Sequence, residues 1–432
     1  MKKFIFLPII FLALFTSCKK DDVTPGNTLT PGIARDSLYY IMKEWYYWYD
    51  LMPNVTKENY ADPYELMDAM RYHPLDRWSF VADYDQFMAE MQGSFVGHGF
   101  RIGLDDANTA RIAMIYSRSP LYAYGVRRGW IVKKINDTDV APVLLSQDGT
   151  AYKNLIGPSE AGVTNKFLFL TPEGKDSVIM STKASFTINS VLVADTIHLS
   201  TGVTAGHMVF ESFIAPSEDE LATAFSYFAT NGVQELILDL RYNGGGYFYI
   251  AQELASYIAG NTYHGSDFIK FIYNSLHQDQ NQSFPFLSTP SPLSLSKIVV
   301  ITTRSTASAS ECVMNGLKPY ISVISIGDTT NGKPVGMDGG DIGKKYFIAP
   351  VTFKDVNKNN EGDFFDGIAP DALVSDDITH NFSDRDELCL KEAISYLETG
   401  SFSATKNMSQ FQRHSQYSEK PEWMKNGFML DK

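Results

Sequence analysis

The fold is decided by the stretch Lys297-Ile-Val-Val-Ile-Thr-Thr303, which continues as Arg304-Ser-Thr-Ala-Ser-Ala-Ser-Glu-Cys312. The apolar run predicts a buried strand, and Glu311-Cys-Val-Met-Asn-Gly-Leu317 predicts the helix after it. A serine at such a turn can carry a nucleophile, because the N–H groups and the macrodipole at a helix start stabilise developing negative charge. An ordinary Ser/Thr helix cap explains the same residues. The rest of the chain therefore decides between the two interpretations.

Strands and helices alternate around this stretch. Strands are predicted at 205–213, 235–241 and 321–326, and helices at 217–230 and 247–259. This alternation favours an α/β core with a parallel sheet. Ser217 and Glu220 fit a capping box at the start of the first of these helices.

The segments after the second helix predict less regular structure. Residues 263–290 show little periodicity and are expected to form a mobile flap. Residues 345–349 and 351–353 predict a hairpin or meander, and 384–398 a final helix. The tail 401–432 is polar and expected to be loosely held.

The composition is that of a globular protein. The chain has 432 residues, enough for two or three domains, with 44% apolar and 20% charged residues. Its net charge of −13 argues against a nucleic-acid partner, since phosphate neutralisation needs a basic face. Cys312 and Cys389 are expected to be buried free thiols, although a disulfide between them is the alternative.

The N-terminus predicts a secretory signal. Met1-Lys-Lys3 is basic, the apolar run 4–15 is too short to span a bilayer, and Thr16-Ser-Cys18 closes it with small residues. The cysteine resembles a lipobox, which implies bacterial type II processing, a lipid on Cys18 and a place in the cell envelope; a plain signal peptide is the alternative. Membrane contact is expected through this anchor only. Residues 19–34 then form a flexible tether.

Two smaller domains are predicted before the α/β core. Residues 35–90 contain an aromatic-rich helix, 35–49, and a second helix from Asp62-Pro63 to Tyr72, which together indicate a small helical domain. A membrane-surface role for the aromatic helix is the alternative. Residues 91–190 are β-rich, with period-two alternation in the strand from Phe100 to Leu104.

The β-rich region resembles a PDZ domain. Gly97, His98, Gly99 and Phe100 stand at the position of the carboxylate-binding loop, and Ser119-Pro120 with Trp130-Ile-Val-Lys-Lys-Ile-Asn136 fits the family pattern loosely. In that family the loop offers backbone N–H groups to a peptide C-terminus, and the peptide adds a strand to the sheet. A PDZ-like fold that no longer binds peptides is the alternative.

Two further segments carry groups suited to catalysis. Asp239-Leu-Arg-Tyr-Asn-Gly-Gly-Gly246 ends a buried strand, where its glycines let the backbone direct N–H groups into a cleft. Asp239 and Arg241 are interpreted as a structural ion pair. Lys333 follows the strand 321–326 in a tight turn. An exposed loop charge is one reading of this lysine; a buried base that deprotonates a serine is the other.

Together these motifs resemble the C-terminal processing serine proteases, peptidase family S41. The family motif Asp-Leu-Arg-x-Asn-x-Gly-Gly is matched by 239–246, and Thr-Ala-Ser-Ala-Ser-Glu is matched without change by 306–311. The family's later Gly-Lys motif is matched by Gly332-Lys333, and its closing Gly-Ile-x-Pro-Asp motif by Gly367-Ile-Ala-Pro-Asp371. Its strand-and-exit motif is matched by residues 208–213. The resemblance implies a multi-domain α/β fold with a ClpP/crotonase-like catalytic core at 191–400.

The resemblance also implies the role of each site residue. Ser308 becomes the nucleophile, with Ser310 as the alternative on sequence alone. Lys333 becomes the general base and then the acid for the leaving amine, the Ser-Lys variant of the triad. The N–H groups of Ala309 and Gly245 become the oxyanion hole. The implied partners are protein or peptide substrates, and no cofactor is expected.

This chain departs from the family pattern at one catalytic position. Many members carry glutamine four residues after the lysine, where Met337 stands here. Gly244 occupies a place where members often have proline, so it is a less favoured oxyanion donor than Gly245. A peptide-binding protein without turnover on the same scaffold is therefore the second hypothesis. Residues 355–363 carry part of a calcium-loop pattern but lack its glycine and its last glutamate, and we interpret them as a turn with no metal.

Overall fold

The computed structural model describes residues 29–403, 411, 413, 416–421 and 428–430. The predicted signal segment and Cys18 lie outside these residues. Within them no helix combines the length and apolar character that a membrane span requires. Cys312 and Cys389 are both buried free thiols, as expected.

A six-stranded sheet forms the centre of the molecule. Five neighbouring strands are parallel and the edge strand β10 is antiparallel, which confirms the predicted α/β core. Their order is β10 (Val191–His198), β11 (Thr204–Phe210), β12 (Glu235–Asp239), β16 (Lys297–Thr302), β17 (Ser322–Gly327) and β22 (Ala372–Leu373).

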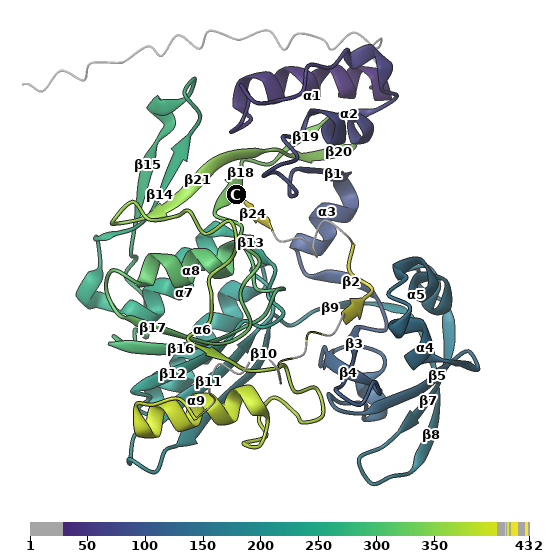
Figure 1. Cartoon of the computed structure of the whole chain (residues 1–432), viewed down its shortest axis with the longest axis vertical. Helices are drawn as coiled ribbons and strands as arrows, with labels where there is room; N and C mark the ends of the chain where they lie inside the picture. The colour runs from purple at the N-terminus through teal and green to yellow at the C-terminus, as the bar shows by residue number, and fades with distance from the viewer. Residues whose placement is uncertain (1–28, 404–410, 412, 414–415, 422–427, 431–432) are drawn as a thin grey trace, which may run out of the picture.

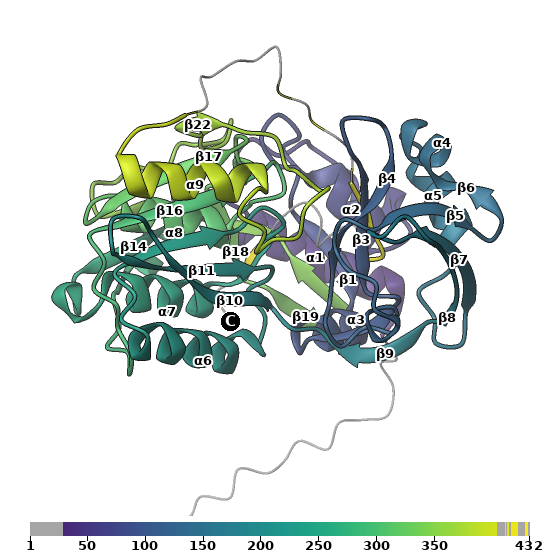
Figure 2. The ribbon, with the colours of Figure 1, turned by 90° about the horizontal axis from the view of Figure 1, so that it is seen from below.

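Helices cover both faces of this sheet (Figure 2). On one face lie α6 (Ser217–Thr230), α7 (Phe248–Ala259) and α8 (Ala309–Leu317), whose apolar residues join one continuous core with the sheet. On the other face lies α9 (Leu388–Thr399), packed over a smaller core. This packing buries the sheet on both faces, which explains why its strands read as continuous apolar runs.

A second six-stranded sheet stands beside the first (Figure 1). Its order is β13 (Gly245–Tyr247), β24 (Phe428–Leu430), β18 (Val335–Met337), β21 (Val351–Asn357), β14 (Asp267–Tyr273) and β15 (Gln282–Pro285). The sequence prediction was wrong in three places here. Residues 263–290 supply a paired hairpin rather than an irregular flap, because Phe268 and Phe271 are fully buried. Residues 346–349 and 351–357 do not form the predicted hairpin, because they pair in different sheets. The tail, which was expected to be loosely held, contributes strands β23 (Gln416–Ser418) and β24.

The N-terminal domain is helical, as predicted, and lies at the edge of the second sheet (Figure 1). It contains α1 (Pro31–Trp45), α2 (Pro63–Met70), α3 (Tyr84–Met91), β1 (Phe80–Asp83) and the 3-10 helix Lys57–Asn59. Its strand β1 pairs with β20 (Tyr346–Ala349), which pairs with β19 (Gly340–Ile342). The predicted tether extends too far, since Thr30 caps α1 and the helix starts at Pro31.

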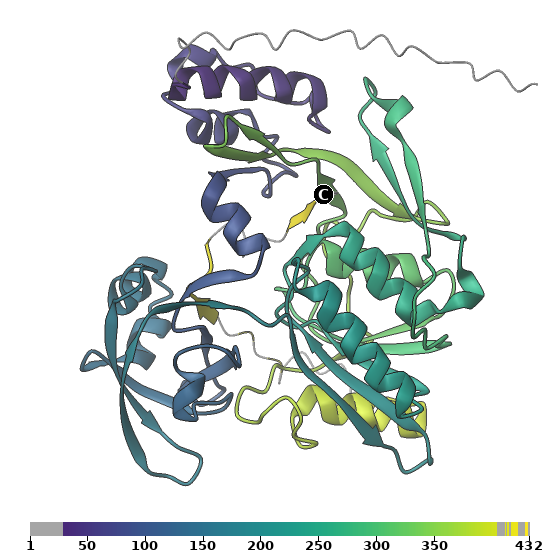
Figure 3. The ribbon, with the colours of Figure 1, turned by 180° about the vertical axis from the view of Figure 1, so that it is seen from behind.

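The β-rich region forms a separate unit beside the two six-stranded sheets (Figure 3). Its main sheet has the order β23-β3-β4-β5-β7-β8, with β6 paired to β5, and a smaller sheet joins β2 to β9. The strands are β2 (Ser94–Gly97), β3 (Phe100–Leu104), β4 (Ala110–Ile115), β5 (Ile131–Ile135), β6 (Thr138–Asp139), β7 (Thr164–Leu170), β8 (Asp176–Thr182), β9 (Ala184–Thr187) and β23 (Gln416–Ser418). Helices α4 (Val140–Leu145) and α5 (Gly149–Ile156) complete it; the remaining 3-10 helices are Tyr122–Tyr124, Asn261–Tyr263 and Gln278–Gln280.

The predicted capping box of α6 is wrong. Pro216 is the N-cap and Ser217 is the first helical residue. The Ser217 hydroxyl donates to the carbonyl of Ser212, and Glu220 accepts from the N–H of Ser190. Glu220 therefore ties α6 to the chain leading into β10 rather than back to its own N-terminus.

Candidate active site

Ser308 lies at the turn between β16 and α8, where it is the N-cap residue. Its backbone has φ 60° and ψ −113°, a conformation that a residue with a Cβ rarely adopts. Its side chain is buried, and among the described residues its hydroxyl has no hydrogen-bond partner. Strained backbone of this kind persists where the surrounding structure enforces it, often at functional sites. The alternative candidate, Ser310, uses its hydroxyl to bind the Asn243 carbonyl at 3.1 Å.

Glu311 holds the serine turn and the lysine turn together. One of its carboxylate oxygens, Oε2, accepts from the N–H of Ser308 at 2.8 Å and from the N–H of Lys333 at 2.9 Å. The other accepts from the N–H of Gly332 at 2.6 Å and from the hydroxyl of Thr330. Burial raises the pKa of this carboxyl, while the hydrogen bond from Thr330 opposes that rise. Sequence reasoning placed Glu311 in a motif but assigned it no role.

Lys333 is fully buried, so the interpretation as an exposed loop charge is wrong. Burial lowers the pKa of its amine to about 7, against the opposing attraction of Asp76, Asp355 and Glu311. The amine lies 3.8 Å from the sulfur of Met337. In the described chain no hydrogen bond joins this amine to the Ser308 hydroxyl. A neutral amine is thus available near neutral pH, although it is not yet aligned with the serine.

The N-terminal domain contributes Asp76 to this site, a residue that the sequence did not single out. Asp76 is buried; its Oδ2 accepts from the Tyr46 hydroxyl at 2.7 Å, and its Oδ1 from the N–H groups of Trp78 and Ser79, each at 2.9 Å. The indole N–H of Trp78 also donates to Asn331 Oδ1 at 3.3 Å. The helical domain therefore supports the loop that leads into the lysine and supplies a negative charge near it.

Asp355, on β21, is a second buried carboxyl near the lysine. Neither of its oxygens has a hydrogen-bond partner among the described residues. Burial raises its pKa to about 7; the charge of Glu311 adds to this rise and Lys333 opposes it. Asp355 and Lys333 therefore titrate in the same pH range and influence one another. Residues 355–357 belong to β21, and Asn357 Oδ1 closes the following turn by accepting from the N–H groups of Asn359 and Glu361.

The two predicted oxyanion donors differ in whether their backbone N–H group already has a hydrogen-bond acceptor. The N–H of Ala309, the first residue of α8, has no acceptor within the described chain. The N–H of Gly245 donates to Asn243 Oδ1 at 2.9 Å, so its predicted role requires Asn243 to move. Gly246 permits the close approach of β13, since a Cβ there would stand 2.0 Å from the Phe213 carbonyl oxygen.

Asp239 and Arg241 form a buried ion pair at 2.7 Å, which confirms their structural interpretation. Arg241 also pairs with Glu387 at 2.7 Å and with Asp376 at 2.8 Å. Loss of one member would leave uncompensated buried charge. The network therefore fixes the strand end that carries the glycine loop.

The Gly97–Phe100 loop of the β-rich region binds a carboxylate of the same chain. Oε2 of Glu419 accepts from the N–H of His98 at 2.7 Å and from the N–H of Gly99 at 3.2 Å. The His98 ring is buried, with ring nitrogens 2.9 Å from Ser181 Oγ and 2.8 Å from Asn165 Oδ1. Burial lowers the pKa of this histidine. The imidazole is thus a support for the loop and not a ligand for the carboxylate.

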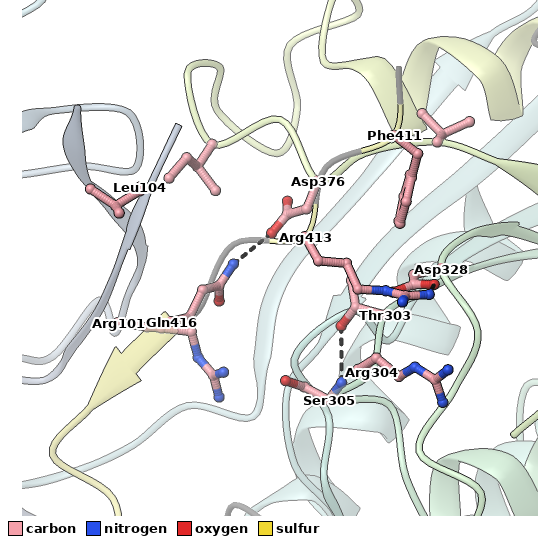
Figure 4. Close-up of a pocket in the computed structure, with 12 residues that line it drawn as sticks. Arg101, Leu104, Thr303, Arg304, Ser305, Asp328, Asp376, Phe411, Arg413 and Gln416 are labelled. Atoms are coloured by element: carbon pink, nitrogen blue, oxygen red, sulfur yellow. Dashed lines mark hydrogen bonds and ion pairs between the residues drawn. The ribbon is translucent and has the colours of Figure 1, made fainter. Parts of the chain in front are cut away.

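A cavity of about 150 Å³ lies between the β-rich region, the segment that follows β16, and the tail (Figure 4). In the figure Arg413 reaches toward Asp328, just after β17, and Gln416 toward Asp376, shortly after β22. Neither Ser308 nor Lys333 lines this cavity. It therefore marks where the tail docks and is separate from Ser308 and Lys333.

Replacing Met337 by glutamine is expected to shift the acid limb of the pH–rate profile to higher pH. A thioether is a weak acceptor, whereas a glutamine oxygen would accept from the Lys333 amine and favour its charged form. Better orientation of the amine should raise kcat above that limb about threefold to tenfold. Peptide hydrolysis measured from pH 5 to 10 checks this. Met337→Leu is the control and should leave the limb in place; an unshifted limb in Met337→Gln would contradict the expected contact.

Comparison with known proteins supports the assignment of these motifs. The family model for peptidase family S41 matches residues 204–374, and the model for the S41 N-terminal domain matches 35–80. The carboxy-terminal processing protease CtpB of Bacillus subtilis (strain 168) is 22% identical over 290 residues, which cover 67% of this chain and 57% of that protein. The chain thus matches little more than half the length of that relative.

A solved structure supports the fold. The crystal structure of a Bacteroides fragilis NCTC 9343 protein described as an S41 protease superposes with a TM-score of 0.70 at 23% identity. The match covers 87% of this chain and 100% of that one. At this identity the similarity extends to the architecture alone.

Proposed function

Because the chain belongs to peptidase family S41, we propose that it is a serine endopeptidase that cleaves protein or peptide substrates through Ser308 and Lys333. The observation that carries the proposal is the shared oxygen of Glu311, which binds the backbone N–H of both residues. This contact places a free hydroxyl and a buried lysine on adjoining turns. A hydroxyl nucleophile with an adjacent amine base is the arrangement that acyl transfer needs.

The chemistry proceeds in two halves. The neutral Lys333 amine takes the Ser308 proton as Oγ attacks the peptide carbonyl, and the resulting ammonium protonates the leaving amine. Water then attacks the acyl-enzyme with the same amine as base. The N–H of Ala309 stabilises the oxyanion in both halves, and loss of one such donor typically costs about 3 kcal/mol of barrier. The N–H of Gly245 joins it once Asn243 has released that group.

Covalent labelling tests the proposal. A fluorophosphonate should form an adduct that peptide mapping by mass spectrometry assigns to Ser308, and Ser308→Ala should remain unlabelled. Lys333→Met should label much more slowly, since its serine has no base. Labelling of Ser310 instead, or peptide hydrolysis that persists in both variants, would overturn the assignment.

A peptide-binding protein without turnover is the second candidate. Two observations favour it: the Gly245 N–H is taken by Asn243, and the lysine amine contacts sulfur rather than the serine. Peptide binding that survives Ser308→Ala, combined with no hydrolysis by the wild type, would select this candidate.

We further propose that the Gly97–Phe100 loop receives peptide carboxylates, because its backbone already binds one. From the sequence alone we propose that a lipid on Cys18 anchors the protein in the bacterial cell envelope. Incorporation of an alkyne-tagged fatty acid by the wild type and equally by Cys18→Ser would refute the anchor.

A further inference from the structure

The tail of the chain runs along the surfaces where a peptide substrate would bind. Strand β23 adds antiparallel to the edge of β3, with Gln416 opposite Gly103 and Ser418 opposite Arg101. Before it, Arg413 pairs with Asp328 of the catalytic part. Strand addition beside a carboxylate-binding loop is how PDZ-type modules hold their ligands.

Glu419 follows β23 directly and occupies that loop. Besides the two N–H groups that it binds, its Oε1 lies 2.9 Å from the amine of Lys183, and both side chains are almost fully buried. A Cβ at Gly97 would stand 2.6 Å from the Phe95 ring and 2.7 Å from the Glu419 carboxylate, so glycine at this position leaves room for both. The pocket is therefore built for a carboxylate, and a side-chain carboxylate within a continuing chain fits it.

The described residues that come after Glu419 lie against β11, β13 and β18, the strands next to the candidate active site. Lys420 pairs with Glu211, just after β11. Strand β24 lies between β13, which carries Gly245, and β18, which carries Met337.

Met429 and Leu430 of β24 are buried. Gly336 and Gly339 lie beside them: a Cβ at Gly336 would meet Met429 at 3.1 Å and one at Gly339 would meet Leu430 at 3.1 Å, although Phe353 and Phe347 would stand closer still. Backbone pairing on both sides and buried side chains are the features of an extended peptide in a cleft.

We infer that the C-terminal tail is an internal occupant of the substrate cleft. It holds the cleft through Glu419 at one end and β24 at the other, and an incoming peptide must displace it. The ligand class follows from the contacts: an extended peptide that adds a strand to β3 and places an acidic side chain, or a terminal carboxylate, against His98, Gly99 and Lys183. This inference rests on the proposed function only where it predicts changes in KM and kcat. Displacement of the tail by a peptide is itself a binding event and requires no hydrolysis.

The test uses the full chain with Glu419→Gln, and Glu160→Gln as control because Glu160 is an exposed acid of the same region. The amide loses the ion pair with Lys183, so the tail should release more often. A labelled peptide of residues 416–430 with the natural Glu419 should bind the variant about tenfold more tightly than the wild type, the effect typical of one charge-assisted hydrogen bond. Trypsin cleavage after Arg413, which precedes β23 and pairs with Asp328, should accelerate to a similar extent, and KM for a peptide substrate should fall while kcat changes little.

A second variant guards against misfolding of the first. Met429→Asp places a charge between β13 and β18 and should have the same effects without touching the β-rich region. Equal peptide binding and equal trypsin sensitivity in the wild type and both variants would overturn the inference. Loss of the tail from the wild type but not from Ser308→Ala, seen by intact-mass spectrometry, would overturn it too, since the tail would then be a substrate. Altered binding with no hydrolysis by any variant would retain the inference and refute the proposed enzyme.

Discussion

Ser308→Ala is expected to lower kcat for peptide hydrolysis by a factor on the order of 10⁴ or more. The hydroxyl forms the acyl bond, so its loss leaves only substrate positioning and the oxyanion donors. Its cost in stability should be small, because within the described chain the hydroxyl makes no hydrogen bond that alanine would break. Hydrolysis rates and thermal unfolding of the same preparation check both parts of this expectation.

Ser310→Ala is the matched control, two residues after Ser308 and in the first turn of α8. It removes one hydrogen bond to the Asn243 carbonyl, which still accepts from the N–H of Ala307 at 3.0 Å. We expect a loss of about 1 kcal/mol in unfolding free energy and a kcat within a few-fold of the wild type. The reverse pattern, with Ser310→Ala inactive and Ser308→Ala active, would assign the nucleophile to Ser310.

The sequence predicted the central sheet well because its signals are local. Buried parallel strands such as β12 and β16 are short apolar runs, and the motif order places their ends at one edge. The hairpin of β14 and β15 was missed because the polar stretch 274–281 separates its strands and β15 itself is short and largely exposed. Only the partner strand β21, distant in sequence, makes their pairing evident.

Only part of the site was predicted, because some of its residues stand in local motifs and others depend on tertiary contacts. Motifs identified Ser308 and Lys333, yet the carboxylate that joins their turns and the charge of Asp76 depend on contacts between distant segments. A polar tail gives no sequence sign that Glu419 meets a glycine loop more than three hundred residues earlier. Such contacts are tertiary, and periodicity contains no information about them.

Lys333→Met is expected to lower kcat about 10³- to 10⁴-fold and to raise thermal stability. Methionine fills a similar volume without a buried amine, so the folded state no longer carries the cost of desolvating that group. Activity and stability should therefore move in opposite directions, which simple misfolding would not produce. A variant that is both inactive and less stable would indicate that the lysine serves the fold.

The pH dependence of the wild type completes this prediction. Because burial lowers the pKa of Lys333 to about 7, the amine is protonated below that value and cannot accept the serine proton. We expect kcat/KM to rise with pH through a midpoint near 7, whereas an exposed lysine would place the midpoint near its ordinary pKa of about 10.4. Asp355→Asn removes a negative charge that favours the ammonium, so its midpoint should lie below that of the wild type. A midpoint that stays in place in Asp355→Asn, or that lies above pH 9 in the wild type, would show that this buried amine is not the base.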